Sequence, residues 1–205
     1  TINGATDLYA YVFRLDNPTL GTAAFAATPV LSSPLNYRKG FADGGTSNQW
    51  HPWTNVAGYN TVDTRSRPSP ILSNIDFSDR GDLMLNFMDR HGNQFGFLNR
   101  RFLQSNDATL IDATIGGELL IAGVDCNGTY TLESNARITT LNGEVITTSG
   151  ANNLQGPGSS TAPVTSGEFF TGDNGIHAEA SMGAFATFPG LGEFITTIMD
   201  PIVVW

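Results

Sequence analysis

The stretch SPILSNIDFSDRGDLMLNFMDRHGNQFGF, Ser69–Phe97, decides the fold class of this chain. Three of its segments alternate apolar with polar residues, the period-two pattern of half-buried strands: Pro70–Phe77, Asp82–Met88 and Asn93–Leu98. SDRG (Ser78–Gly81) and DRHG (Asp89–Gly92) separate these segments, and both contain aspartate and glycine, which favour tight turns. The stretch therefore predicts three antiparallel strands joined by two turns.

The same strand-like pattern continues through the rest of the chain, and no long helical periodicity interrupts it. Further predicted strands are Asp7–Leu15, Glu118–Val124, Gly128–Ser134, Ala136–Thr140, Glu144–Thr148, Ala184–Phe188 and Glu193–Met199. Asn127-Gly128 favours a hairpin with a type I′ turn. Residues 1–205 are therefore predicted to form one all-β domain, and a sandwich, a barrel and propeller blades all fit this spacing.

Two long polar stretches interrupt the strands, at residues 41–70 and 149–170. The first contains Trp50 and Trp53, and the second is rich in Gly, Ser and Thr. Loops of this length inside a compact domain are usually functional, interfacial or mobile.

The composition suits an extracellular protein. Only 14% of the 205 residues are charged, and the net charge is −9 with a single lysine, Lys39. Nucleic-acid binding and adsorption to anionic membranes both need clustered basic residues, so neither is expected. No apolar run approaches the roughly 18 residues of a membrane span. The single Cys126 excludes an internal disulfide and is expected to be a buried, small apolar side chain.

Several motifs occur in an order that points to a family: Trp50, Pro52 and Trp53, then Pro68–Gln94, then Gly156–Pro201. From about Phe41 onward the chain resembles the propeller-like region of large secreted bacterial surface proteins, which often carry SdrD B-like or other Ig-like repeats. The resemblance implies an irregular β-propeller, with a β-sandwich as the alternative, at the bacterial cell surface. Asn74 and Asn86 depart from the family pattern, which commonly has Asp and Gly there.

The family carries no established activity, and no catalytic motif is present, so an enzyme is not expected. The absence of a starting Met and of a signal-peptide pattern predicts a mature product or a piece of a longer protein.

The aspartates of the opening stretch are weak metal candidates. A calcium loop that begins at Asp76 would place Arg80 and Phe87 where oxygen ligands are needed, so the helix–loop–helix template fails. A turn is the favoured interpretation, and a calcium site of another kind that uses Asp76, Asp79 or Asp89 is the alternative. No other cofactor is expected.

Ligand binding has five candidate residues. His177 and Glu179 are two apart on an extended segment, so they point to the same side. Trp50 and Trp53 either stack on sugars or anchor their loop, and Asp89 either organises loop amides or lines a rim.

Asn127, in the sequon Asn127-Gly128-Thr129, is the candidate glycosylation site. It lies at the tip of the predicted hairpin, where a sugar would be tolerated.

These observations predict a structural or adhesive module, and a filament or surface-layer subunit fits them. Its partners would be further copies or neighbouring domains, which would pair with the edges formed by Asp7–Leu15 and Ile195–Trp205. Glycans are further candidate partners. The alternative is a carbohydrate-binding or carbohydrate-active propeller that uses rim carboxylates with Trp50 and Trp53.

Overall fold

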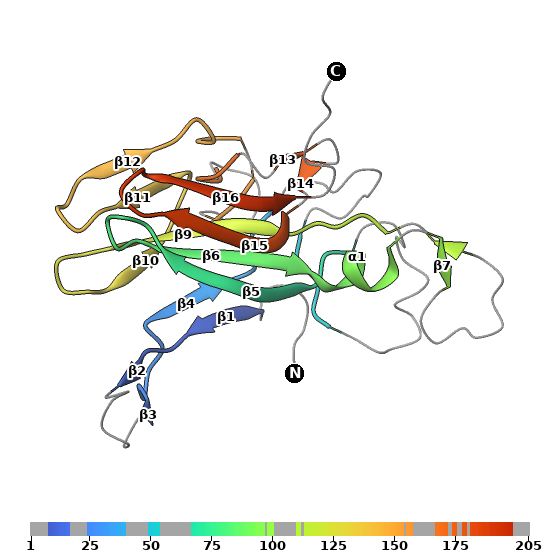
Figure 1. Ribbon diagram of the computed structural model, residues 1–205, viewed down its shortest axis with the longest axis horizontal. Helices are drawn as coiled ribbons and strands as arrows, with labels where there is room; N and C mark the ends of the chain where they lie inside the picture. The colour runs from blue at the N-terminus through green and yellow to red at the C-terminus, as the bar shows by residue number, and fades with distance from the viewer. Residues whose placement is uncertain are drawn as a thin grey trace.

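In the computed structural model the described part of the chain is built from small antiparallel sheets and one short helix (Figure 1). The structure describes residues 8–16, 24–39, 49–53, 67–96, 98–100, 110–111, 113–153, 155–157, 167–171, 174–175, 178–179 and 181–198. Within these ranges no sheet closes on itself. The all-β class predicted from the sequence is confirmed.

The centre is a four-stranded sheet in the order β10-β9-β6-β5. Its strands are β5 (Pro70–Phe77), β6 (Leu83–Asp89), β9 (Glu118–Val124) and β10 (Tyr130–Leu132). All seven residues of β9 are buried, and all of β6 except Met88 are buried as well. Both faces of these two strands are therefore covered, whereas the sequence pattern alone predicts one buried face.

The first face is covered by a long, irregular ribbon formed near the N-terminus. β1 (Tyr9–Val12) pairs with β4 (Leu31–Pro34), and β2 (Leu15–Asp16) pairs with β3 (Ala24–Phe25). The predicted strand Asp7–Leu15 is thus divided into β1 and β2. Apolar side chains of the ribbon pack with those of the central strands into one core: Val12, Leu31, Leu35, Tyr37, Trp50, Leu83, Leu85, Phe87, Leu120 and Ala122.

The second face is covered by two hairpins. β15 (Ser181–Phe188) pairs with β16 (Glu193–Ile198), and β11 (Arg137–Thr139) pairs with β12 (Val145–Thr147). The second core contains Met84, Leu119, Ile121, Ile138 and Phe185, with phenylalanines packed around it. The start of β15 approaches so closely that a Cβ on Gly117 would lie 2.0 Å from the Ser181 carbonyl oxygen.

Two small ribbons complete the described strands: β7 (Asn99–Arg100) with β8 (Leu110–Ile111), and β13 (Asn174–Gly175) with β14 (Ala178–Glu179). The described parts of the two long predicted loops pack on the body. Gly167 accepts a hydrogen bond through its carbonyl from the backbone N–H of Ala136 at 2.7 Å. A Cβ on Gly150 would lie 2.0 Å from the Glu168 carbonyl oxygen, so these two segments are in close contact.

The prediction of a strand at Asn93–Leu98 is wrong. Residues Arg90–Phe95 form the helix α1, with Asp89 as its N-cap and Gly96, at φ +56°, ending it. The carboxylate of Asp89 binds the N–H groups that a first helical turn leaves without partners, so the chain turns into a helix where strand β6 ends. DRHG is therefore the start of a helix rather than a tight turn between strands.

The turn predicted at Ser78–Gly81 is confirmed, since Gly81 has a φ of +83° and its N–H donates to the Ser78 carbonyl. The tip of the β9–β10 hairpin differs from the prediction. Gly128 has a φ of +77°, whereas Asn127 does not have a positive φ, so the turn is not type I′. Asp125 explains the difference, because its carboxylate accepts the N–H groups of Asn127 and Thr129.

Cys126 is exposed at this tip, contrary to the expectation that it is buried. The neighbouring residues of the tip are exposed as well, and a Cβ on Gly128 would meet nothing within 4 Å, so the described structure does not bury this tip.

Candidate interaction site

Asp89 is fully buried and serves the backbone. Its two carboxylate oxygens accept four N–H groups, from Ser69 (2.8 Å), His91 (2.8 Å), Gly92 (3.1 Å) and Gly116 (3.2 Å). The donors join the start of β5, helix α1 and the segment before β9. Asp89 therefore organises loop amides, which is one of the two roles considered for it. The prediction that Asp89 binds a ligand is wrong, because its carboxylate has no exposed surface.

Asp76 and Asp79 also hold other segments. Asp76 accepts the hydroxyl of Thr187 at 2.9 Å, and the backbone N–H of Phe77 is the main cause that lowers its pKa. Asp79 accepts the N–H groups of Gly190 (2.8 Å) and Gly192 (3.0 Å), so it binds the turn between β15 and β16.

Asp76 and Asp89 lie too far apart to act together on one substrate or one metal ion. Asp89 of β6 lies opposite Pro70 of β5, and Asp76 is six residues further along β5. At about 3.3 Å per residue the two aspartates are therefore about 20 Å apart. Two cooperating glycosidase carboxylates lie only about 5–9 Å apart. The described part of the chain contains no group of three or more His, Cys, Asp or Glu residues that could hold a metal ion.

The two tryptophans have different environments. Trp50 is fully buried, its indole N–H donates to the Tyr37 hydroxyl at 3.2 Å, and its ring packs on Phe87. A ring without exposed surface cannot stack on a sugar, so Trp50 is corrected from a ligand candidate to a core residue. Trp53 is exposed, but its N–H donates to the Pro70 carbonyl at 3.0 Å and Arg90 lies over its ring, so it anchors this segment to β5.

The remaining candidates are only partly placed. His177 lies outside the described residues, and Glu179 lies in β14 without a described side chain. Asn127 is exposed at the β9–β10 tip, a position that a glycan can reach, and its glycosylation stays a prediction.

The first core also contains buried polar side chains that the sequence analysis did not single out as a group. The Tyr37 hydroxyl donates to Glu118 at 2.8 Å, and burial, followed by the charge of Glu118, raises the pKa of Tyr37 well above its usual value. Lys39 is 1% exposed, donates to the Gly117 carbonyl at 3.3 Å and lies over the Trp50 ring. Because Lys39 is the only lysine, the surface of the chain presents no lysine ammonium group.

The most distinctive surface is a row of apolar side chains along β1 and β2, which we call the aromatic edge. Tyr9, Tyr11, Phe13 and Leu15 occupy alternate positions, point outward together, and are each 44–52% exposed. The Tyr9 and Tyr11 ring centroids are 5.9 Å apart, and those of Tyr11 and Phe13 are 6.5 Å apart. Contiguous exposed rings of this kind mark interaction surfaces more often than isolated apolar residues do.

The backbone of the aromatic edge is oriented for strand pairing. The carbonyls of Leu8, Val12 and Arg14 accept hydrogen bonds from the β3–β4 side of the ribbon. In an antiparallel pair the intervening residues direct their N–H and C=O groups the other way. Among the described residues no strand pairs with that outer side of β1. The edge therefore combines available backbone groups with an apolar face.

The charges beside the aromatic edge cancel each other. Arg14 and Asp16 flank Leu15 and form an ion pair with Nε to Oδ1 at 2.7 Å. Among the described residues 8–16 these two charges offset each other, which lowers the electrostatic cost of bringing two copies of a chain with a net charge of −9 together.

Comparison of the chain with family models, with curated proteins and with solved structures finds no match. None of the helices in the described ranges has the length and apolar character that crossing a membrane requires.

Proposed function

We propose that this chain is an extracellular structural or adhesive module of a bacterial surface protein, and that it associates with further copies of itself through the aromatic edge. The observation that carries the proposal is that, among the described residues, the outer side of β1 has no strand partner and four exposed apolar side chains follow one another along β1 and β2. Soluble proteins commonly protect such edges with charges, prolines or short strands, because an unprotected edge pairs with other chains. Among the described residues of β1 itself, Tyr9–Val12, no charge or proline is present.

The cellular setting rests on the resemblance to secreted bacterial surface proteins and on the low content of charged residues. A filament or a surface layer is the assembly that suits an edge strand, because strand addition extends a sheet without changing the fold of the subunits. The propeller-like arrangement of the whole region, and contacts with neighbouring domains, belong to the same proposal.

Sedimentation velocity over a range of concentrations tests self-association. We expect the unmodified chain to associate, and we expect Tyr11→Lys to weaken association at least tenfold, because it places an ammonium group in the apolar row. Val145→Lys is the matched control, since Val145 is an equally exposed apolar strand residue on β12, 49% against 52%. A chain that stays monomeric at millimolar concentration, or a control that weakens association equally, would refute the proposal.

A second candidate function is carbohydrate binding at the same edge. The rings of Tyr9 and Tyr11 are both about half exposed, so they offer apolar area together with phenolic hydroxyls, which suits the apolar face of a sugar. Tyrosine fluorescence during titration with soluble polysaccharides tests this function. Binding that is lost in Tyr11→Ala while the protein remains monomeric would favour carbohydrate binding over self-association.

A further inference from the structure

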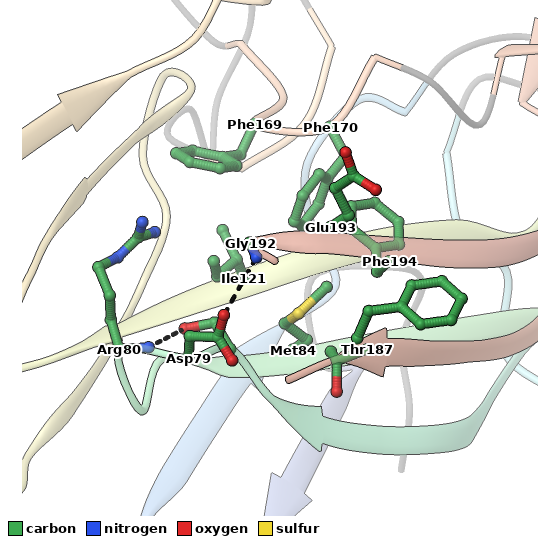
Figure 2. A pocket seen from close by; sticks show the side chains of 12 residues that line it. Asp79, Arg80, Met84, Ile121, Phe169, Phe170, Thr187, Gly192, Glu193 and Phe194 are labelled. Carbon is green, nitrogen blue, oxygen red and sulfur yellow. Dashed lines mark hydrogen bonds between the residues drawn. The ribbon is translucent and has the colours of Figure 1, made fainter. Parts of the chain in front are cut away.

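A small apolar pocket lies on the second face of the central sheet (Figure 2). Its floor is formed by Met84 of β6 and Ile121 of β9, which are direct partners in the ladder. Phe169, Phe170 and Phe194 stand around this floor. The pocket therefore combines a floor on the two most buried strands with aromatic walls from segments distant in the sequence.

The walls of the pocket are fixed by hydrogen bonds. Glu133 accepts the backbone N–H groups of Ile121 and Phe169, so it holds the phenylalanine segment against β9. On the other side Asp79 holds the β15–β16 turn through Gly190 and Gly192, and Figure 2 shows the bond to Gly192. A site with fixed walls needs little ordering when an occupant enters, which favours binding.

The size and the mainly apolar lining of the pocket suit one aromatic ring. Its volume is about 140 Å³. An apolar protein cavity of about 150 Å³ stays dry and accommodates one benzene molecule. Phe169 and Phe170, and Phe170 and Phe194, meet edge to face with centroids 5.2 and 5.0 Å apart. A further ring can join this arrangement, because aromatic rings prefer edge-to-face contacts.

The surface of the same chain presents a ring that lacks a covering layer. Phe25 of β3 is 72% exposed, the highest value among the large apolar side chains described. It lies opposite Leu15 in the β2–β3 ribbon, which extends away from the stacked sheets in Figure 1. Phe25 thus stands beside the end of the aromatic edge, on a ribbon that projects from the stacked sheets.

We propose that the pocket receives the ring of Phe25 from a second copy of this chain. The inference rests on the proposed self-association and specifies its contact. Phe25 is the best-exposed ring described, it is carried on a projecting ribbon, and the pocket has the volume of one ring. The partner is therefore a second copy whose β2–β3 ribbon docks against the second face.

The contact has to be made between molecules. The β1–β4 ribbon covers the first face of the central sheet, whereas the pocket lies on the second face, among the residues of the second core. The ring and the pocket are thus on different surfaces, and one contact leaves a free ring on one copy and a free pocket on the other. Repeated contacts of this kind build open chains or closed rings.

The charges around the two surfaces are compatible. Arg80 and Glu193 lie at the pocket, on opposite sides in Figure 2. The docking ribbon carries one cation and one anion as well, Arg14 and Asp16. Each side therefore presents both signs, so the contact does not force like charges together.

Two complementary variants test the contact. Phe25→Ser removes the ring, and Glu193→Trp covers the pocket from an exposed position at its rim. We expect each variant alone to associate at least tenfold more weakly than the unmodified chain, since burying one phenylalanine side chain corresponds to about ten- to a hundredfold in affinity. We expect a mixture of the two to form a one-to-one complex, because one supplies the ring and the other supplies the pocket. Leu141→Ser, which removes another exposed apolar side chain, should leave association unchanged.

The outcomes separate this inference from the proposed function. If both variants assemble like the unmodified chain while Tyr11→Lys does not, the pocket contact is wrong and the aromatic edge alone mediates assembly. If the unmodified chain is monomeric, both proposals fall.

A direct probe uses toluene and the methyl NMR signals of Met84 and Ile121. Toluene should shift both signals in the unmodified chain and neither in Glu193→Trp. Signals that do not move in either protein would show that the pocket does not accept a ring.

Discussion

SDRG at Ser78–Gly81 and DRHG at Asp89–Gly92 look alike in sequence, and the structure uses them differently. In SDRG the exposed Asp79 binds two amides of a turn more than a hundred residues away. In DRHG the fully buried Asp89 caps a helix and binds four amides from three segments. The same Asp-Arg pattern therefore makes an exposed contact between two turns at one end of β6, which we call the Asp79 clasp. At the other end it makes a buried contact between three backbone segments.

The difference comes from what covers each end of β6. Helix α1 presses so closely on the segment before β9 that a Cβ on Gly92 would lie 2.6 Å from the Ile115 Cα. Water cannot replace the carboxylate there, so each amide depends on Asp89. At Asp79 water has access, so loss of the carboxylate leaves the amides with an alternative partner.

The largest effect is expected from Asp89→Ala. Four buried N–H groups would lose their acceptor, and a helix would lose its cap, so the free energy of unfolding should fall by about 4 kcal/mol. Urea denaturation measures this change. Asp89→Asn keeps an acceptor oxygen and should cost clearly less. A loss below about 1 kcal/mol in Asp89→Ala would mean that the two carboxylates are equivalent after all.

Glu133 extends the comparison, because it also binds two backbone amides, and burial dominates its pKa. Burial raises the pKa of Glu133 from 4.5 to about 8, and the hydrogen bonds from Ile121 and Phe169 only partly oppose this. The folded protein thus holds a proton that the unfolded chain releases near pH 4.5. Between these two values the unfolded state binds fewer protons, so the free energy of unfolding falls as pH rises.

We expect the stability of the unmodified chain to decrease between about pH 5 and 8, by an amount on the order of 3 kcal/mol. Glu133→Gln should flatten this dependence whatever its effect on stability at a single pH. Denaturation at a series of pH values provides the slope, and Glu144→Gln, at an exposed position, is the matched control. An unchanged slope in Glu133→Gln would assign the dependence to other groups.

The smallest effect is expected from Asp79→Ala. The exposed carboxylate should contribute only about 1 kcal/mol to global stability. Its loss should act locally, because the β15–β16 turn is held to the β5–β6 turn by this side chain. Hydrogen exchange should speed up at the amides of Gly190 and Gly192 and stay unchanged at those of β9. If hydrogen exchange speeds up equally at the amides of β9, the contact made by Asp79 supports the whole fold and not only the turn.

Much of the strand content was predictable because it depends on local pattern. The alternation in Pro70–Phe77 and Asp82–Met88 matches β5 and β6, and the glycines at positions 81, 128 and 143 mark turns in which φ is positive. The helix at Arg90–Phe95 was missed, although Asp89 is a favoured N-cap residue and supplied the one available signal. Its six residues are too few for a helical period to stand out against the neighbouring strands.

The candidate interaction site was only partly predictable. The strand Asp7–Leu15 was expected to offer an edge, and its alternation places Tyr9, Tyr11 and Phe13 on one face. Which of its two faces is covered depends on the packing of the ribbon against the central sheet, and periodicity cannot show this. Trp50 and Trp53 make the same point, since two residues of one type, three apart, have opposite exposure.

The sequence by itself determined the all-β class, most strand positions and several turns, because these follow from side-chain alternation and from backbone preferences within a few residues. Only the tertiary structure decided which strands are buried on both faces, which aspartate is internal, and where three phenylalanines meet to form a pocket. Those properties arise from contacts between segments that can lie more than a hundred residues apart. The free energy of burying a side chain depends on what covers it, not on its neighbours in the chain.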